Sequence, residues 1–193
     1  GLAPYFSYAT SFMPQTSRDW LGQPFAPLTG RQYEAGLKYQ VPKTDILLTA
    51  SAFHLDENHY LISDPIHTNY NADAGRVTSK GVELSASANI TKDLHVVASY
   101  TYTDIRYAKS NLTQRTIDPA TGVTGDLVSE RGKYVQSIPR NMMSASFDYR
   151  PPVKIMKGFG FDWGIRYGGF HYADDSNSFK VPPYVLFDVG AHY

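Results

Sequence analysis

Hydrophobic and polar residues alternate one by one along residues 29–41. The odd-numbered positions carry Tyr33, Ala35, Leu37, Tyr39 and Val41, and the even-numbered positions carry Gln32, Glu34, Gly36, Lys38 and Gln40. An extended chain directs successive side chains to opposite faces, whereas a helix would scatter both sets around its axis. The pattern therefore predicts a β-strand with one apolar face and one polar face that stays in contact with water.

The same alternation recurs along the chain and predicts eight strands. They are expected at residues 2–9, 30–41, 46–57, 82–90, 94–103, 140–149, 159–168 and 185–193. Long connections are expected at 10–28, 58–75, 108–133 and 171–181, and short ones at 42–45, 91–93 and 150–157. Transmembrane barrels have short turns on one side and longer loops on the other, whereas a soluble sandwich gives no reason for lengths to alternate. The sequence therefore predicts an all-β, antiparallel transmembrane β-barrel.

This interpretation gives each face of the strands an environment. The lipid is expected to contact Leu37, Val82, Leu84, Val96, Phe147, Trp163 and Val189. The lumen is expected to be lined by Glu34, Lys38, Glu83, Ser85, Asp162, Arg166 and Asp188. Aromatic residues near strand ends fit the girdles at membrane interfaces, namely Tyr39, Tyr102, Tyr149 and Tyr193.

Composition narrows the classes of function. Lys and Arg total 18 and balance 18 Asp and Glu, so the chain offers no net field for a polyanion and nucleic acid is not an expected partner. It has no cysteine, which excludes disulfides and cysteine-ligated zinc. The chain contains no run of about 18 apolar residues, so no membrane-spanning helix is predicted. The first residues do not resemble a signal peptide, so the chain is expected to be part of a longer protein.

Few residue patterns indicate chemistry. Residues 158–164 are rich in glycine but lack the spacing of a dinucleotide fingerprint, and small residues facing a barrel interior explain them better. Four residues close together could ligate a metal, namely His54, Asp56, Glu57 and His59. They span a strand end and a loop, where polar residues are expected without any metal. Residues 174–177 lack the glycine and glutamate of a calcium loop and predict a turn. We expect no enzyme activity, no metal site and no cofactor.

Two sets of side chains are candidates for ligand contact. The first consists of aromatic residues in the expected loops, which either pack the loops or stack on a ligand: Phe12, Trp20, Phe25, Tyr70 and Tyr172. The second consists of basic residues near the loop-side ends of strands: Arg76, Lys80, Arg106, Lys109, Arg131 and Lys133. These form either a solvated rim or a contact with anionic lipid headgroups or an anionic ligand.

Several segments together resemble the C-terminal half of the barrel of TonB-dependent outer-membrane siderophore receptors, most closely the ferrichrome and ferrioxamine (hydroxamate) type. They are SYATSFMP at 7–14, GRQYEAGLKY at 30–39, KGVEL at 80–84, SYTYTD at 99–104, IPRN at 138–141 and DDSNSFKVP at 174–182. Their shared order covers essentially the whole chain. No single segment is specific, and the resemblance rests on all of them together.

The resemblance implies that residues 1–193 are a C-terminal portion of a barrel of about 22 strands that encloses a plug domain absent from this chain. It implies uptake of a ferric siderophore, energised by the TonB-ExbB-ExbD complex through that plug, in the outer membrane of a bacterium among lipid and lipopolysaccharide. No binding residue transfers from the family. The alternatives are a complete eight-stranded outer-membrane barrel acting as an adhesin, pore or small membrane enzyme, and a soluble all-β binding module.

Overall fold

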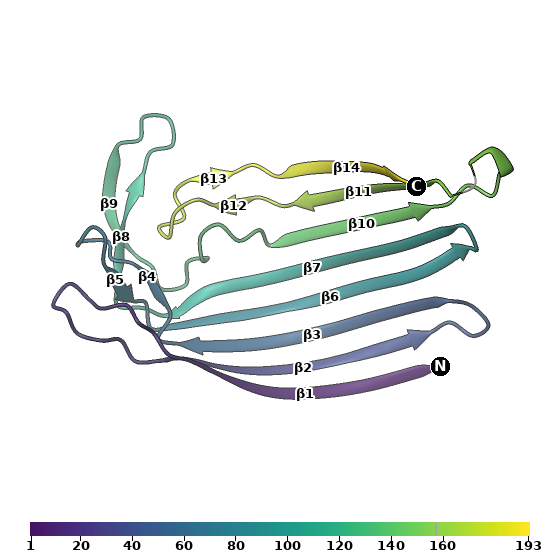
Figure 1. Ribbon diagram of the computed structural model, residues 1–193. Coiled ribbons are helices and arrows are strands. Elements are labelled where there is room, and N and C mark those ends of the chain that lie inside the picture. Colours follow the sequence, from purple (N-terminus) through teal and green to yellow (C-terminus); the bar gives the residue numbers. More distant parts are fainter. Residues whose placement is uncertain (157) are drawn as a thin grey trace.

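One antiparallel sheet of eight strands forms the body of the computed structural model, which describes residues 1–156 and 158–193 (Figure 1). Its strands are β1 (Leu2–Met13), β2 (Leu28–Gln40), β3 (Ile46–Asn58), β6 (Arg76–Thr91), β7 (Leu94–Lys109), β10 (Asn141–Tyr149), β11 (Gly160–Gly168) and β14 (Tyr184–His192). Each strand pairs with the next main strand along the chain. The predicted all-β, antiparallel architecture is confirmed.

Three strands are longer than the hydrophobic pattern predicts. β1 continues to Met13 instead of ending at residue 9, β6 begins at Arg76 instead of residue 82, and β7 extends to Lys109 instead of residue 103. The extensions of β6 and β7 carry polar side chains on the face that is apolar elsewhere, and Thr10 interrupts the apolar face of β1, so the hydrophobic alternation is lost at these places. The hydrogen-bonded ladder continues without it because backbone pairing does not depend on side-chain polarity.

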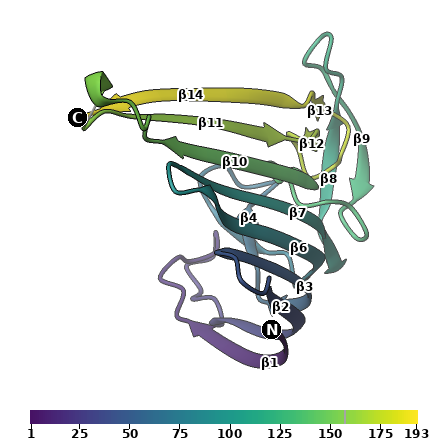
Figure 2. The ribbon, with the colours of Figure 1, turned by 90° about the vertical axis from the view of Figure 1, so that its right-hand side faces the viewer.

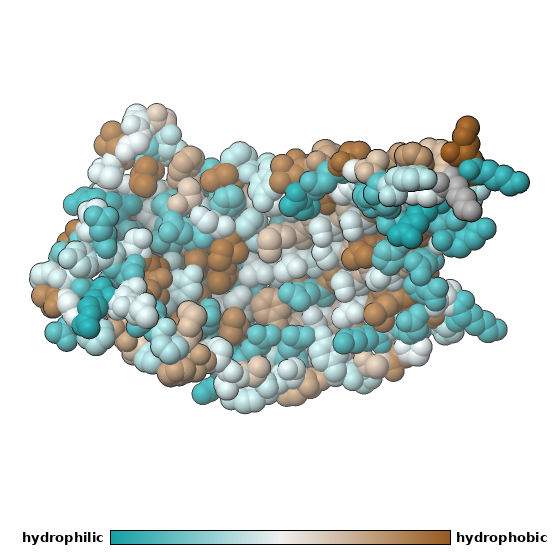
Figure 3. Space-filling model, in the orientation of Figure 1, coloured by the Kyte–Doolittle hydropathy of each residue, from teal (hydrophilic) through white to brown (hydrophobic). Residues whose placement is uncertain are grey.

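Short strands lie within the long connections, where irregular loops were expected. The hairpins are β4 (Leu61–Ser63) with β5 (Asn71–Asp73), β8 (Thr113–Ile117) with β9 (Thr124–Ser129), and β12 (His171–Tyr172) with β13 (Lys180–Val181). A 3₁₀ turn, η1 (Lys154–Met156), lies in the short connection at 150–157, whose last residue is outside the described residues. All long connections meet at one end of the sheet and the short turns at the other (Figure 1). Hydrophilic side chains gather at the turn end (Figure 3).

Strand register places the two predicted sets of side chains on opposite faces. Leu37 pairs with Ala50, and Ala50 pairs with Leu84, whereas Lys38 pairs with Thr49 on the other face. Side chains on the apolar face are the more exposed ones, with 48% exposure at Leu84, while Ser51 on the polar face is buried. Side chains converge on a concave surface and diverge on a convex one, so the polar face is the inner face.

The sheet is curved and open (Figure 2). Glycines on its inner face let neighbouring side chains lie close; the ring of Phe53, for example, covers Gly81. Within the described residues no pairing joins β1 to β14, so these eight strands do not close into a barrel, contrary to the alternative of a complete small barrel. No helix in the described part of the chain is long and apolar enough to cross a membrane.

Candidate functional site

The loops fold over the inner face of the sheet at its loop end. Val77 and Tyr107, both on the inner face, pack with Ile62, Ala74 and Val135 from the connections into the buried hydrophobic cluster of the described residues. This cluster is small, but it fixes the β4–β5 hairpin and the segment after β9 against the wall. These parts of the connections therefore form a cover at the loop end of the wall, whereas the β8–β9 hairpin extends away from the sheet (Figure 1).

Polar contacts tie the last connection to the others. The hydroxyl of Tyr107 donates to Asp175 at 2.6 Å, and the backbone N–H of Gln136 donates to the same carboxylate at 3.2 Å. Asn177 accepts from the N–H of Tyr134 at 2.7 Å and donates to its carbonyl at 2.8 Å. Residues 174–177 do form the predicted turn, with Asn177 in the left-handed region at φ 56. The sequence did not indicate that this turn also joins two loops.

A second buried carboxylate lies under the β8–β9 connection. Glu130 is fully buried and accepts hydrogen bonds from Ser110 at 3.0 Å and Gln114 at 2.8 Å. Burial raises the pKa of the Glu130 carboxyl, these two hydrogen bonds lower it, and the charge of Asp175 adds to the increase, with a raised pKa as the result. Burial likewise raises the pKa of Asp175. The cover therefore holds two carboxyl groups whose pKa is raised by burial.

Trp20 lies in the first connection, as predicted, and stacks on His67 with ring centroids 4.3 Å apart. Gln15 in the same connection donates to the carbonyl of His59 at 2.9 Å, which joins residues 14–27 to the β4–β5 hairpin. Tyr70 is exposed directly before β5 of that hairpin, and Phe25 is half-buried. His67 is the member of this group that the sequence analysis did not select.

Tyr172 lies in β12 and belongs to a separate aromatic group. It stacks on Tyr134 at 6.0 Å and meets the edge of Phe170 at 6.3 Å. The ammonium of Lys180 lies 4.8 Å from the Phe170 ring centroid. The stacking of Tyr172 on Tyr134 was not visible in the sequence, because these two residues are far apart along the chain.

Phe12 is not a loop residue, which corrects the prediction. It lies in β1, pairs with Thr29, and is 68% exposed on the face that carries Phe6 and Tyr8. The prediction failed because Thr10 interrupts the apolar alternation, so the sequence pattern placed the end of the first strand at residue 9. The structure thus places Phe12 on the outer face of β1, Trp20 beside His67 and Tyr172 beside Tyr134, and these candidates do not form one group.

The possible metal ligands at the end of β3 do not converge. His54 and Asp56 bond to each other at 3.3 Å on the outer face, Glu57 points to the inner face, and His59 bonds to Asp73 at 2.8 Å. Among the described residues no group of three or more His, Cys, Asp or Glu side chains could hold a metal ion.

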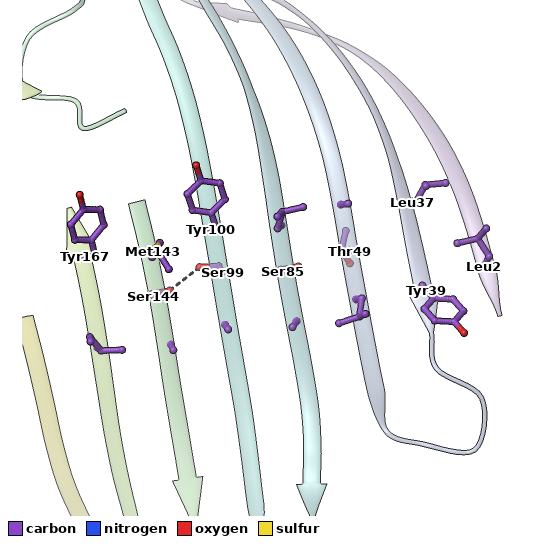
Figure 4. A pocket seen from close by; sticks show the side chains of 17 residues that line it. Leu2, Leu37, Tyr39, Thr49, Ser85, Ser99, Tyr100, Met143, Ser144 and Tyr167 are labelled. Carbon is purple, nitrogen blue, oxygen red and sulfur yellow. Dashed lines mark hydrogen bonds between the residues drawn. The ribbon is translucent and has the colours of Figure 1, made fainter. Parts of the chain in front are cut away.

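An apolar hollow of about 730 Å³ lies on the outer face, away from the mouth (Figure 4). Leu37, Tyr100 and Tyr167 border it, and a row of alanines that includes Ala98 and Ala145 forms its floor. Small side chains surrounded by larger ones leave a shallow hollow in the convex surface there. Its lining suits hydrocarbon chains and lacks the few directed polar groups of a ligand pocket.

A wall with an apolar outer face, a polar inner face and connections gathered over one mouth defines the class of outer-membrane β-barrel proteins. Comparison with known proteins agrees, because a family model described as TonB dependent receptor-like, β-barrel matches residues 1–193. The chain belongs to this family, whose members are bacterial outer-membrane proteins. The family is one of transporters and receptors and not of enzymes.

Two curated relatives match the chain over its whole length. The ferrichrome outer membrane transporter/phage receptor of Escherichia coli is 33% identical over 193 residues, and the ferrioxamine B receptor of Salmonella typhimurium is 32% identical. The chain spans 24% and 25% of the length of these relatives.

Solved structures share the fold. The siderophore receptor PiuA of Acinetobacter baumannii superposes with a TM-score of 0.71 at 23% identity, covering 100% of this chain and 27% of that one. The ferric yersiniabactin uptake receptor FyuA of Yersinia pestis gives 0.71 at 18% identity, covering 98% and 27%.

Proposed function

We propose that residues 1–193 form a C-terminal portion of the barrel of an outer-membrane receptor that takes up ferric siderophores of the hydroxamate type. The main support is the match of the whole chain to the ferrichrome transporter and the ferrioxamine B receptor. The strands would be the wall of the transport path, and the cover of loops would meet the ligand from outside. The proposal assigns no catalytic step to this chain.

The loop cover has the chemistry for a first contact with such a ligand. Trp20 is half exposed beside His67, and Tyr172 lies beside Tyr134 and Phe170, so two aromatic surfaces border the mouth. Aromatic rings can pack on the apolar parts of a metal chelate, and basic side chains can meet its oxygens. Energy would come from the TonB-ExbB-ExbD complex through a plug domain, and outer-membrane lipid or lipopolysaccharide would surround the wall.

Replacing Trp20 and Phe25 by Ala in the full-length receptor should weaken ferric-siderophore binding and leave barrel assembly intact. The loss should be about tenfold, the equivalent of about 1.4 kcal/mol, because the stacking surface is removed while the strand ladder is untouched. Affinity is measured by fluorescence titration with a ferric hydroxamate siderophore, and uptake is measured with radioactive iron.

Leu21→Ala is the matched control, since Leu21 is a neighbouring exposed apolar residue in the same connection. An equal loss in the control would show a general effect of the loop. Unchanged affinity in the double variant would remove Trp20 and Phe25 from the site. A receptor-deletion strain that takes up every ferric hydroxamate normally would contradict the transport function itself.

A further inference from the structure

The two aromatic groups at the loop end differ in the charges that surround their rings. In the group around Tyr172, cations of the protein already lie over the rings. The guanidinium groups of Arg106 and Arg140 lie 4.0 and 4.9 Å from the ring centroid of Tyr134. The ammonium of Lys180 lies 5.7 Å from the ring centroid of Tyr172. Positive charge therefore already occupies these rings, and a positively charged ligand would be repelled there.

Trp20 offers an aromatic surface of the opposite kind. It stacks on His67 with an angle of 12° between the ring planes, and it is 50% exposed. Among the described residues no Lys or Arg side chain lies over its ring. Indole attracts cations more strongly than the other aromatic side chains do. The part of the Trp20 ring that His67 leaves uncovered can therefore receive a positively charged group of a ligand.

Asp64 fixes the orientation and the protonation of His67. Nδ1 of the imidazole donates to the carboxylate at 2.9 Å, and the backbone N–H groups of Ile66 and His67 donate to it at 2.8 and 3.0 Å. A carboxylate only accepts, so the proton of the neutral ring is on Nδ1 and the lone pair is on Nε2. Nε2 has no hydrogen-bond partner among the described residues and is not buried. It can therefore accept a hydrogen bond from a ligand.

The two connections that carry the stack also favour a cation. Residues 14–27 and 59–75 are joined by the hydrogen bond from Gln15 to the carbonyl of His59. Their charged residues are one cation and three carboxylates, namely Arg18, Asp19, Asp64 and Asp73. With the histidines neutral, the two segments carry an excess of two negative charges, although the whole chain has no net charge. The field near the stack thus attracts positive charge and opposes negative charge.

We propose that the Trp20–His67 stack is a contact site for an ammonium group, and that the receptor favours ferric hydroxamate siderophores with a free amine over neutral or anionic ones. The ammonium lies over the uncovered part of the indole ring and donates to Nε2 of His67, and Asp64 is a positioning residue. A chelate without such a group loses the cation–π contact and the charge-assisted hydrogen bond. This inference rests on the proposed function and adds the charge of the ligand to it.

The test compares two ligands that differ in this charge. Ferrioxamine B ends in a free primary amine, which is protonated at neutral pH, and its N-acetyl derivative has a neutral amide there. Binding of both iron complexes to the full-length receptor is measured by fluorescence titration in a buffer of low ionic strength. The unaltered receptor should bind ferrioxamine B about tenfold more tightly than the N-acetyl form, because only the first makes the cation–π contact.

Two variants assign this preference to the stack. Trp20→Ala should bring the two affinities to within about twofold of each other, because the cation–π surface is lost. Asp64→Asn keeps an oxygen for the two backbone N–H groups, but its amide donates to Nδ1, so Nε2 carries the proton and no longer accepts. This variant should weaken binding of ferrioxamine B about threefold more than binding of the N-acetyl form.

Tyr172→Ala is the matched control, because it removes a ring from the other aromatic group and should leave the ratio of the two affinities unchanged. Equal affinities in the unaltered receptor would overturn the inference alone. A preference that persists in Trp20→Ala and Asp64→Asn, or that is lost equally in Tyr172→Ala, would overturn it as well. Absence of binding of both iron complexes to the unaltered receptor contradicts the proposed function, on which the inference rests.

Discussion

Among single residues, Glu130 is a titratable group that lies out of contact with water. Its carboxylate is fully buried in the loop cover, where Ser110 and Gln114 donate to it. A buried carboxyl group without a cationic partner favours its neutral form. The stability of the cover should therefore depend on pH through this residue.

Because the pKa of Glu130 is raised above its ordinary value of 4.5, the folded cover holds a proton more tightly than the opened cover does. Opening should be hardest below pH 4.5 and become easier as the pH rises through the raised pKa. Glu130→Gln should weaken this dependence, and the part due to Asp175 should remain. Hydrogen exchange of the Glu130 and Leu112 amides, corrected for the intrinsic effect of pH, measures the difference; identical pH profiles in both proteins would contradict it.

At the scale of elements, strands β2, β3, β6 and β7 depend on close contact across the inner face. A Cβ atom at Gly81 would collide with the backbone carbonyl oxygen of Tyr102 and lie 2.6 Å from Cζ of Phe53. Backbone cannot move aside as a flexible side chain can. This glycine is therefore required by its neighbours and not by its own dihedral angles.

Gly81→Ala should lower the free energy of unfolding by about 1–3 kcal/mol, the usual effect of overpacking. Gly190→Ala is the control, because a Cβ atom there would be 3.7 Å from its nearest neighbour, in Asp162. Urea unfolding of the full-length receptor in lipid vesicles, followed by tryptophan fluorescence, compares the two variants. Equal stability of both would show that the strands adjust at Gly81.

The sequence predicted these elements unequally well. Period-two alternation was enough to order the eight main strands and to assign faces to residues such as Leu37 and Lys38, because successive side chains of a strand point into different environments. It did not locate the strand extensions at Thr78 or Arg106, because the outer face is polar there and the apolar side chains lie on the inner face instead. It also did not reveal the loop cover, since the bond from Tyr107 to Asp175 joins residues 68 positions apart.

For the whole molecule, the main feature is a sheet with two unpaired edges. β1 and β14 each present backbone N–H and C=O groups that hydrocarbon does not satisfy. Residues 1–193 alone should therefore not refold in detergent into the heat-modifiable, protease-resistant monomer typical of closed barrels. Refolding is followed by gel mobility with and without boiling, with the full-length receptor as control. A compact, heat-modifiable monomer would contradict the prediction.

The extension of β7 beyond Tyr102 also sets the height of the mouth. The strand continues from the last apolar row to Lys109, which adds roughly 20 Å of paired backbone at about 3.3 Å per residue. In the proposed receptor, the entrance would thus be raised on this rim above the lipid surface. A water-soluble ligand arriving from outside would meet the aromatic rings of the loops before it reached the headgroups, and its capture would not require partitioning into the membrane.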